Sequence, residues 1–275
     1  MDEECVLEMI PSANMPEAVF EKGKVSVIMP AYNCERLIGE SIQSVQKQTY
    51  ANWELVVVND ASTDHTADEV LQYQKLDHRI KLINLAVNSG TQTARNTAIR
   101  NSSGQYIAFL DSDDLWEPDK LKEQIAFMQA NGYGFTFTAY HPFSSEDNSR
   151  KKTFHVPHSI TYSQYLKNTI IGNLTVMIDR NLIPNVYVVK GELEDTLTWM
   201  NILKTGIIAH GLDQDLAAYR VYRASRSGNK AKNVIRQFRC LHEYQHISVM
   251  KSIGYEAGYI INAISKRLIG KTIIN

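Results

Sequence analysis

Short apolar runs alternate with helix-period stripes through the first part of the chain. Runs rich in Val, Ile and Leu at 24–29, 53–58, 80–85 and 105–110 predict buried strands. Between them, apolar residues three and four positions apart predict helices, most clearly over 35–48. Because strands and helices alternate four times, we expect βαβ units and a parallel sheet.

The pattern continues less regularly towards the C-terminus. Alternating or β-branched runs predict further strands over 135–140, 174–178 and 216–221. Helices are predicted over 117–130, 197–203, 231–252 and 256–269, with a break at Gly254 between the last two. The whole is an α/β pattern with a mixed, mostly parallel sheet flanked by helices and a C-terminal helical appendage.

Composition adds little until the charge is divided along the chain. The 275 residues are 44% hydrophobic and 21% charged, which is typical of a soluble globular enzyme, and the net charge is −1. Residues 220–275 nevertheless hold 11 Lys and Arg against 2 Asp and Glu. Two interpretations stay open: this segment binds an anionic partner such as a diphosphate or lipid surface, or it is a solvated basic face.

The three cysteines and the chain start bear on location. Cys5, Cys34 and Cys240 lie far apart and form no CxxC or zinc-ligand spacing, which favours ordinary thiols in a reducing compartment. The acidic start has no signal-peptide h-region, and no apolar run reaches the ~18 residues of a spanning helix. We expect a cytoplasmic protein, or one peripheral on the inner face of the cell membrane.

Polar clusters follow each of the first four predicted strands. They are Tyr32-Asn33, Asn59-Asp60, Asn88-Ser89-Gly90 and Asp111 to Asp114. Ligands of open α/β sheets bind outside the carboxyl ends of the strands, so these clusters should line one crevice. Neither a GxGxxG fingerprint nor a P-loop is present. A buried strand that runs into three carboxylates predicts a divalent cation that holds a diphosphate.

Five motifs in order carry a family resemblance: 27–33, 58–64, 88–96, 110–114 and Glu194-Asp195. Together they resemble the inverting family 2 glycosyltransferases of the GT-A fold, over roughly 24–230. Within the family, the chain looks like bacterial enzymes that build cell-surface polysaccharide such as O-antigen, capsule or teichuronic acid. The resemblance implies transfer of a sugar from a nucleotide sugar, most readily a UDP-sugar, to an acceptor hydroxyl.

The resemblance also divides the chain. Residues 1–23 form an N-terminal extension, 24–230 the catalytic domain and 231–275 a C-terminal helical region. Within the catalytic domain, 24–115 is the nucleotide-binding half and 116–230 the acceptor half.

By resemblance, the nucleotide sugar is bound by Pro30, Ala31, Tyr32, Asn33, Asp60, Arg95, Asp111, Ser112, Arg223 and Lys230. Asp60 would accept a hydrogen bond from the uracil imide, or it is a turn or cap residue. Tyr32 would stack on the base, or it is a half-buried strand-end tyrosine. Arg95 would lie near the base and diphosphate, or it is a surface helix arginine.

The same resemblance assigns the metal and the base. Asp111 and Asp113 share one face of an extended stretch and would hold Mn²⁺ or Mg²⁺, whereas Asp114 either helps the site or caps the next helix. Asp195 would be the general base, with Glu194 as its supporting neighbour. A glycine usually precedes the Glu-Asp pair directly, and here it does not, so Glu192 is a rival.

The C-terminal part leaves several alternatives. The basic segment 219–230 predicts either a lid over the diphosphate or a plain loop, and it lacks the histidine that many relatives have there. The apolar stripe Ala257, Ile260, Ile261, Ile264 and Leu268 suits an anionic membrane surface, packing on the domain, or a homodimer contact.

The expected partners follow from the same reasoning. They are a nucleotide sugar and a saccharide or lipid-linked saccharide acceptor, but not nucleic acid. The alternatives to the transferase are a sugar nucleotidyltransferase and a non-catalytic nucleotide-binding module. The first would want a Gly-rich basic loop after the first strand, which 30–35 does not provide.

Overall fold

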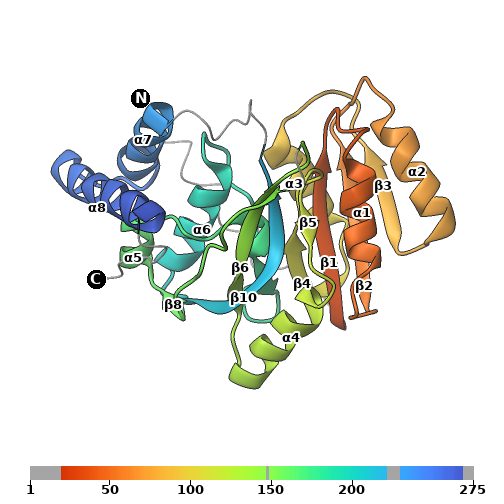
Figure 1. Ribbon diagram of the computed structural model, residues 1–275, viewed down its shortest axis with the longest axis horizontal. Coiled ribbons are helices and arrows are strands. Elements are labelled where there is room, and N and C mark those ends of the chain that lie inside the picture. Colours follow the sequence, from red (N-terminus) through yellow and green to blue (C-terminus); the bar gives the residue numbers. More distant parts are fainter. Residues whose placement is uncertain (1–19, 147–148, 222–229, 269–275) are drawn as a thin grey trace, which may run out of the picture.

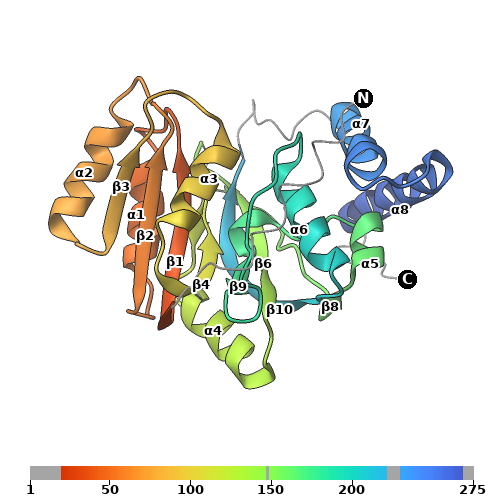
Figure 2. The same ribbon diagram turned by 180° about the vertical axis from the view of Figure 1, so that it is seen from behind.

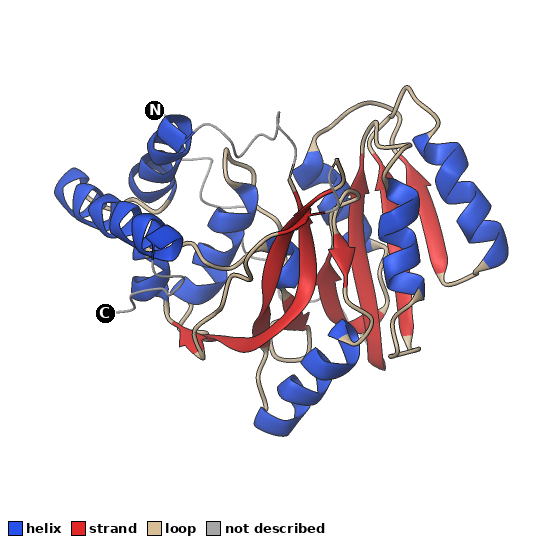
Figure 3. Cartoon of the chain, in the orientation of Figure 1, coloured by secondary structure: helices blue, strands red, loops and turns tan. Residues whose placement is uncertain are grey.

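One mixed ten-stranded sheet runs through the structure, a computed structural model that describes residues 20–146, 149–221 and 230–268. Helices cover both faces of the sheet, and a group of helices lies at one end, opposite α2 and β3 (Figures 1 and 2). Figure 3 shows the same division by element type. The predicted α/β class is confirmed.

The strand order explains why the strand-end clusters meet. The sheet runs β3-β2-β1-β4-β9-β6-β10-β5, with β7 paired to β6 and β8 paired to β10. The strands are β1 (Glu21–Ala31), β2 (Trp53–Asn59), β3 (Ile80–Asn84), β4 (Gly104–Phe109), β5 (Leu115–Trp116), β6 (Phe135–Ser144), β7 (Ser149–Arg150), β8 (Ser159–Ile160), β9 (Met177–Asp179) and β10 (Ala209–Arg220). All the longer strands run in one direction, so their carboxyl ends share an edge.

The helices of the described residues connect and cover these strands. They are α1 (Ile38–Gln46), α2 (Thr66–Leu76), α3 (Thr91–Arg100), α4 (Lys120–Asn131), α5 (Tyr162–Lys167), α6 (Glu194–Lys204), α7 (Lys230–Arg239) and α8 (Val249–Leu268). Two short helical segments, η3 (Asn173–Thr175) and the π-helical η5 (Cys240–Tyr244), complete the set. The side chains of 230–232 and 260–268 lie outside the description, and with them most of the predicted apolar stripe on α8.

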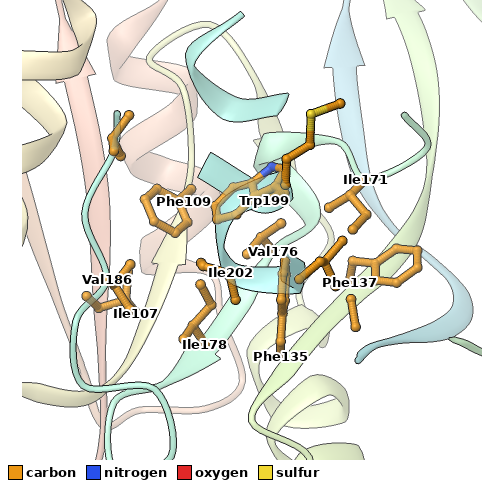
Figure 4. Packing of buried hydrophobic residues seen from close by; sticks show 14 of the residues in the cluster. Ile107, Phe109, Phe135, Phe137, Ile171, Val176, Ile178, Val186, Trp199 and Ile202 are labelled. Atoms are coloured by element: carbon orange, nitrogen blue, oxygen red, sulfur yellow. The ribbon is translucent and has the colours of Figure 1, made fainter. Parts of the chain in front are cut away.

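Alternate residues of the central strands pack on opposite faces, as period-2 strands require. Val27 and its face-mates pack with α1, α2 and α4, whereas Ile28 packs with α3 and α6. On the second face, Trp199 of α6 lies edge-on to Phe109 at 5.3 Å between ring centroids and tilted against Phe135 at 5.5 Å (Figure 4). This cluster anchors α6, which carries the Glu194-Asp195 pair, against the sheet.

Several boundaries differ from the sequence prediction. The strand predicted over 174–178 begins only at Met177, after the short helical segment η3. The helix predicted from 117 begins only at Lys120, because Leu115–Trp116 forms β5 beside β10. The predicted strand 216–221 is the end of a longer strand, Ala209–Arg220. The predicted break at Gly254 was wrong: α8 continues through it, and the interruption lies at η5, where Gln245 N–H bonds Cys240 O at 3.0 Å.

Candidate active site

The loops after β1 and β2 are joined by Asn33. Its backbone has a positive φ of 48°, which Asn tolerates better than most residues. Its N–H donates to Ser62 Oγ at 3.0 Å, and its Oδ1 accepts from Thr63 N–H at 2.8 Å. The neighbouring Tyr32 remains 48% exposed. The joined loops therefore hold an accessible aromatic ring at the strand-end edge.

Asp60, directly after β2, fastens the start of α3. Its Oδ1 accepts from Ser89 N–H at 2.7 Å, and its Oδ2 accepts from Gly90 N–H at 2.8 Å. Gly90 has φ +87°, a conformation that side-chain-bearing residues rarely adopt, and α3 begins at the next residue. Asp60 thus holds the backbone at the start of α3, which agrees with the turn or cap alternative; recognition of the base by Asp60 stays a prediction.

The acidic turn after β4 is fixed from a distant strand. Asp114 is buried, with 1% of its surface exposed, and its Oδ1 accepts the N–H of Arg220 at 2.8 Å. Burial raises the pKa of the Asp114 carboxyl well above its ordinary value, and the neighbouring Asp113 adds to this. Because α4 begins only at Lys120, the interpretation of Asp114 as a helix cap was wrong.

Arg220, at the end of β10, clamps this turn with its side chain. Its Nε donates to the carbonyl oxygen of Asp113 at 2.6 Å, and its Nη2 donates to Glu40 Oε2 at 2.6 Å. The guanidinium also lies 4.6 Å from the ring centroid of Phe143. Arg220 belongs to the basic segment 219–230, for which a lid or a plain loop is predicted. In the structure, Arg220 instead supports the acidic turn.

Arg95 joins two acidic groups from opposite parts of the chain. Its side chain is 5% exposed, which excludes the surface-arginine interpretation. Nη2 donates to Asp111 Oδ1 at 2.6 Å, and Nη1 is in very close contact with Asp195 Oδ1 and 3.9 Å from Glu194 Oε2. A single guanidinium thus connects the end of β4 with the first turn of α6. Burial raises the pKa of the Asp195 carboxyl; Arg95 opposes this shift.

Glu192, the rival for the base, is engaged elsewhere. Its Oε1 accepts from Arg239 Nη1 at 2.8 Å, and its Oε2 lies 3.7 Å from Arg236 Nε. Asp195, by contrast, is held through Oδ1, and its Oδ2 has no hydrogen bond within the described part of the chain. The geometry favours Asp195 over Glu192 as a group that can take up a proton.

A cavity of about 1020 Å³ brings the predicted residues together. Its lining includes Pro30, Ala31, Tyr32, Asn33, Asp60, Arg95, Asp111, Ser112, Asp113, Glu194 and Asp195. Arg223 lies outside the described residues, and the side chain of Lys230, the first residue of α7, is likewise not described. The strand-end crevice expected from the sequence is therefore present.

Two contributors were missed by the sequence analysis. Asn173 of η3 donates from Nδ2 to Asp111 Oδ1 at 3.4 Å, and Arg220 holds the turn that carries Asp113. The basic segment did signal Arg220, although for another role. Nothing in the local pattern marked Asn173, because its segment carries no motif.

The donor set suits a cation that arrives with a phosphate. Among the described residues, no group of three or more His, Cys, Asp or Glu side chains could enclose a metal ion. Asp111 and Asp113 instead place hard oxygen atoms in a cavity large enough for a second ligand. Mg²⁺ and similar ions are commonly held by one or two carboxylates plus substrate phosphates, so this pair fits such an ion.

Solved structures with the same fold are known. The chain superposes on Staphylococcus aureus TarS (residues 1–349) in complex with UDP with a TM-score of 0.65, at 22% identity, covering 88% of this chain and 72% of that one. A mannosyltransferase from Pyrobaculum calidifontis, solved with GDP-Man and Mn²⁺, gives a TM-score of 0.60 at 17% identity over 94% and 79% of the two chains. Both superpositions show that the chain has the GT-A fold.

Sequence comparison then gives the family. The family described as "Glycosyl transferase family 2" matches residues 26–189. TuaG of Bacillus subtilis (strain 168), assigned provisionally to teichuronic acid biosynthesis, is 41% identical over 90% of this chain and 98% of its own length. WfgD of Escherichia coli, a UDP-Glc:α-D-GlcNAc-diphosphoundecaprenol β-1,3-glucosyltransferase, is 42% identical over 88% and 94%. The chain belongs to glycosyl transferase family 2.

Among the residues that the structure describes, no helix is both long enough and apolar enough to span a bilayer.

Proposed function

We propose that the chain transfers a sugar from a UDP-sugar to a hydroxyl group of a saccharide acceptor, with inversion at the anomeric carbon and dependence on Mn²⁺ or Mg²⁺. The pathway is bacterial surface polysaccharide synthesis. Relatives that match over nearly their full length support this assignment: WfgD and WfaP are both named for glucose transfer from UDP-Glc to a lipid-linked N-acetylglucosamine.

The observation that carries the proposal is the shared guanidinium of Arg95. It binds Asp111 on the acidic turn and Asp195 at the start of α6 within one cavity. A displacement with inversion needs the leaving group and the base on opposite faces of the sugar carbon, close enough for one ring to lie between them. Carboxylates held by the two nitrogens of one side chain meet the closeness requirement.

The donor end of the cavity has chemistry for a nucleotide. Tyr32 offers an exposed ring for stacking on the base. Asp60 lies nearby and accepts a hydrogen bond from Gly90 N–H at the start of α3. Asp111 and Asp113 would hold the divalent ion, which when bound neutralises charge on the diphosphate. Arg95 would add a fixed positive charge near the oxygens of the diphosphate.

The acceptor hydroxyl is activated by Asp195. The oxygen of this hydroxyl forms the new bond to the anomeric carbon while the bond from that carbon to the β-phosphate oxygen breaks. The nucleoside diphosphate leaves with the bonding electrons. The hydroxyl proton passes to the Asp195 carboxylate, whose Oδ1 is oriented by Arg95. Glu194 adds negative charge beside the pair and stabilises the cationic Arg95.

The experiment is a donor panel. The protein is incubated with UDP-, GDP- and TDP-sugars and Mn²⁺, with and without acceptor, and nucleoside diphosphate release is measured. Release from UDP-sugars is expected, and the product anomer is read by NMR. Release of pyrophosphate instead would identify a sugar nucleotidyltransferase, and binding without turnover a nucleotide-binding module.

The base is tested by Asp195→Asn. This variant keeps the shape of the side chain but cannot take up the proton, so transfer should fall by about 10³-fold or more while UDP binding persists. Glu192→Gln is the comparison variant, and its kcat at saturating acceptor should stay within about threefold of the wild-type value, because Glu192 is not expected to take up the proton. If Asp195→Asn abolished UDP binding, the assignment of Asp195 as base would be rejected.

A further inference from the structure

The cavity is large for a pocket that binds one ligand. Its volume of about 1020 Å³ slightly exceeds the 300 to 1,000 Å³ typical of such pockets. Besides the strand-end residues, its lining includes Thr169, Glu192, Asn233, Arg236, Gln237 and Tyr259. This second group, the α7–α8 wall, comes from the segment after α5, the segment before α6, and α7 and α8.

The α7–α8 wall is tied to the segment that carries the candidate base. Glu192 is paired with Arg236 and Arg239 of α7, and it lies three residues before Asp195. The α7–α8 wall and the candidate base therefore line the same cavity. α7 and α8 lie at the opposite end of the molecule from α1 and α2 (Figure 1).

Gln237 on α7 carries a buried side-chain amide. The residue lines the cavity, its surface is 2% exposed, and its Nε2 has no hydrogen-bond partner among the residues that the structure describes. Buried amide groups are almost always paired, because an unpaired donor loses its bonds to water without replacement. Arg236 Nε also lacks a hydrogen bond among the described residues, but it lies 3.7 Å from the carboxylate of Glu192.

The composition of the wall indicates the kind of ligand. Asn233 and Gln237 carry amides, Thr169 and Tyr259 carry hydroxyls, and the charges of Glu192 and Arg236 offset each other. A phosphate group would call for net positive charge, whereas amides and hydroxyls match the hydroxyl groups of a sugar ring. The wall is therefore suited to an uncharged sugar.

We propose that the α7–α8 wall is the acceptor subsite, that it takes an uncharged hexose or N-acetylhexosamine ring, and that Gln237 is a specificity-determining residue which donates from Nε2 to an oxygen of that ring. The inference rests on the proposed function, since it names the second substrate's place in the same reaction. Gln237 contacts the acceptor and takes no part in the chemical step.

The test uses the donor that the panel selects and four neutral probes: the methyl glycosides of glucose, galactose, N-acetylglucosamine and N-acetylgalactosamine. At least one should raise UDP release above the donor-only rate. For that probe, Gln237→Leu should raise the acceptor KM about 10-fold or more and leave the donor KM within about twofold. Its Tm should stay equal or rise, because an unpaired buried amide is removed.

Gln245→Leu is the matched control. Gln245 is equally buried, but its Oε1 accepts from Tyr162 Oη and its Nε2 donates to Asn201 Oδ1, both at 2.8 Å. This variant should lower the Tm and leave the acceptor KM unchanged. Gln237→Leu should thus change the acceptor KM but not lower the Tm, whereas Gln245→Leu should lower the Tm but not change the acceptor KM.

Failure of the inference can be told apart from failure of the function. No diphosphate release from any donor would overturn the proposed function. Release with no stimulation by a neutral glycoside would overturn the uncharged-ring subsite alone. So would an unchanged acceptor KM in Gln237→Leu, or a loss of Tm together with activity, which would make Gln237 a structural residue.

Discussion

Lys120 is a fully buried lysine, and its removal should stabilise the protein. It lies at the start of α4, where Nζ donates to Gln124 Oε1 at 2.8 Å and stands 4.1 Å from the centroid of the Trp116 ring. No carboxylate pairs with it in the described part of the chain, and burial lowers the pKa of its ammonium from 10.5 to about 7. The substitution considered is Lys120→Met, which keeps the length of the side chain.

The magnitude follows from that pKa shift. At about 1.4 kcal/mol per unit, the depression corresponds to roughly 5 kcal/mol against the charged form, of which about 4 kcal/mol acts at pH 7. The substitution also loses the hydrogen bond to Gln124 and the contact with the Trp116 ring, which offsets about 1 kcal/mol of this stabilisation. Lys120→Met should therefore raise the free energy of unfolding by about 3 kcal/mol at pH 7.

The pH dependence has a definite sign. Between pH 7 and 10.5 the unfolded chain holds the lysine proton and the folded chain does not, so wild-type stability rises with pH in this window. Well below pH 7 both states are protonated and the burial cost is complete. The advantage of Lys120→Met should thus be largest below pH 7 and shrink towards pH 10.

Urea unfolding at pH 6, 7, 8 and 9 measures this difference. Lys122→Met, on the exposed side of the same helix, is the control and should change stability by less than about 0.5 kcal/mol. The reasoning would be refuted if Lys120→Met had the same advantage at pH 6 and pH 9, or if it destabilised the protein.

Three further variants test the site and its support. Arg95→Lys replaces a planar fork by a single ammonium, which cannot hold the two carboxylates at the spacing set by two guanidinium nitrogens, so kcat should fall about 100-fold while circular dichroism shows a folded protein. Trp199→Ala empties the centre of the core beneath α6 and should lower the free energy of unfolding by about 3–5 kcal/mol in urea titrations. Gly191→Ala would make Cβ overlap with Leu197 Cδ1, so the Leu197 side chain or the start of α6 must shift, and kcat should fall more than the donor KM changes; unaltered kcat would contradict this.

The donor side of the site was predictable from the sequence because its signals are local. Each strand from β1 to β4 ends in a polar cluster within a few residues, and the parallel sheet brings these ends to one edge. Tyr32, Asp60 and Asp111 could therefore be placed in one crevice without knowing a single long-range contact.

The remaining features depend on contacts between distant segments. The acidic turn is held by Arg220, 106 residues after Asp114, and Arg95 reaches Asp195 across 100 residues. No spacing rule connects such pairs. The π-helical break before α8 likewise follows from packing, since Gln245 must meet Tyr162 and Asn201. A glycine at 254 suggested a break, but tertiary contacts overrode that propensity.

The unbroken sheet limits how this enzyme can open and close. β10 lies beside β6 along most of its length, and it pairs with β5 immediately after the acidic turn. β4 also pairs with β9, so the strands before and after the acidic turn share one hydrogen-bonded layer, and a hinge rotation between them would break strand pairing. Entry and exit of substrates must instead depend on elements attached at the rim, so slow turnover would report on helix and loop displacement and not on domain closure.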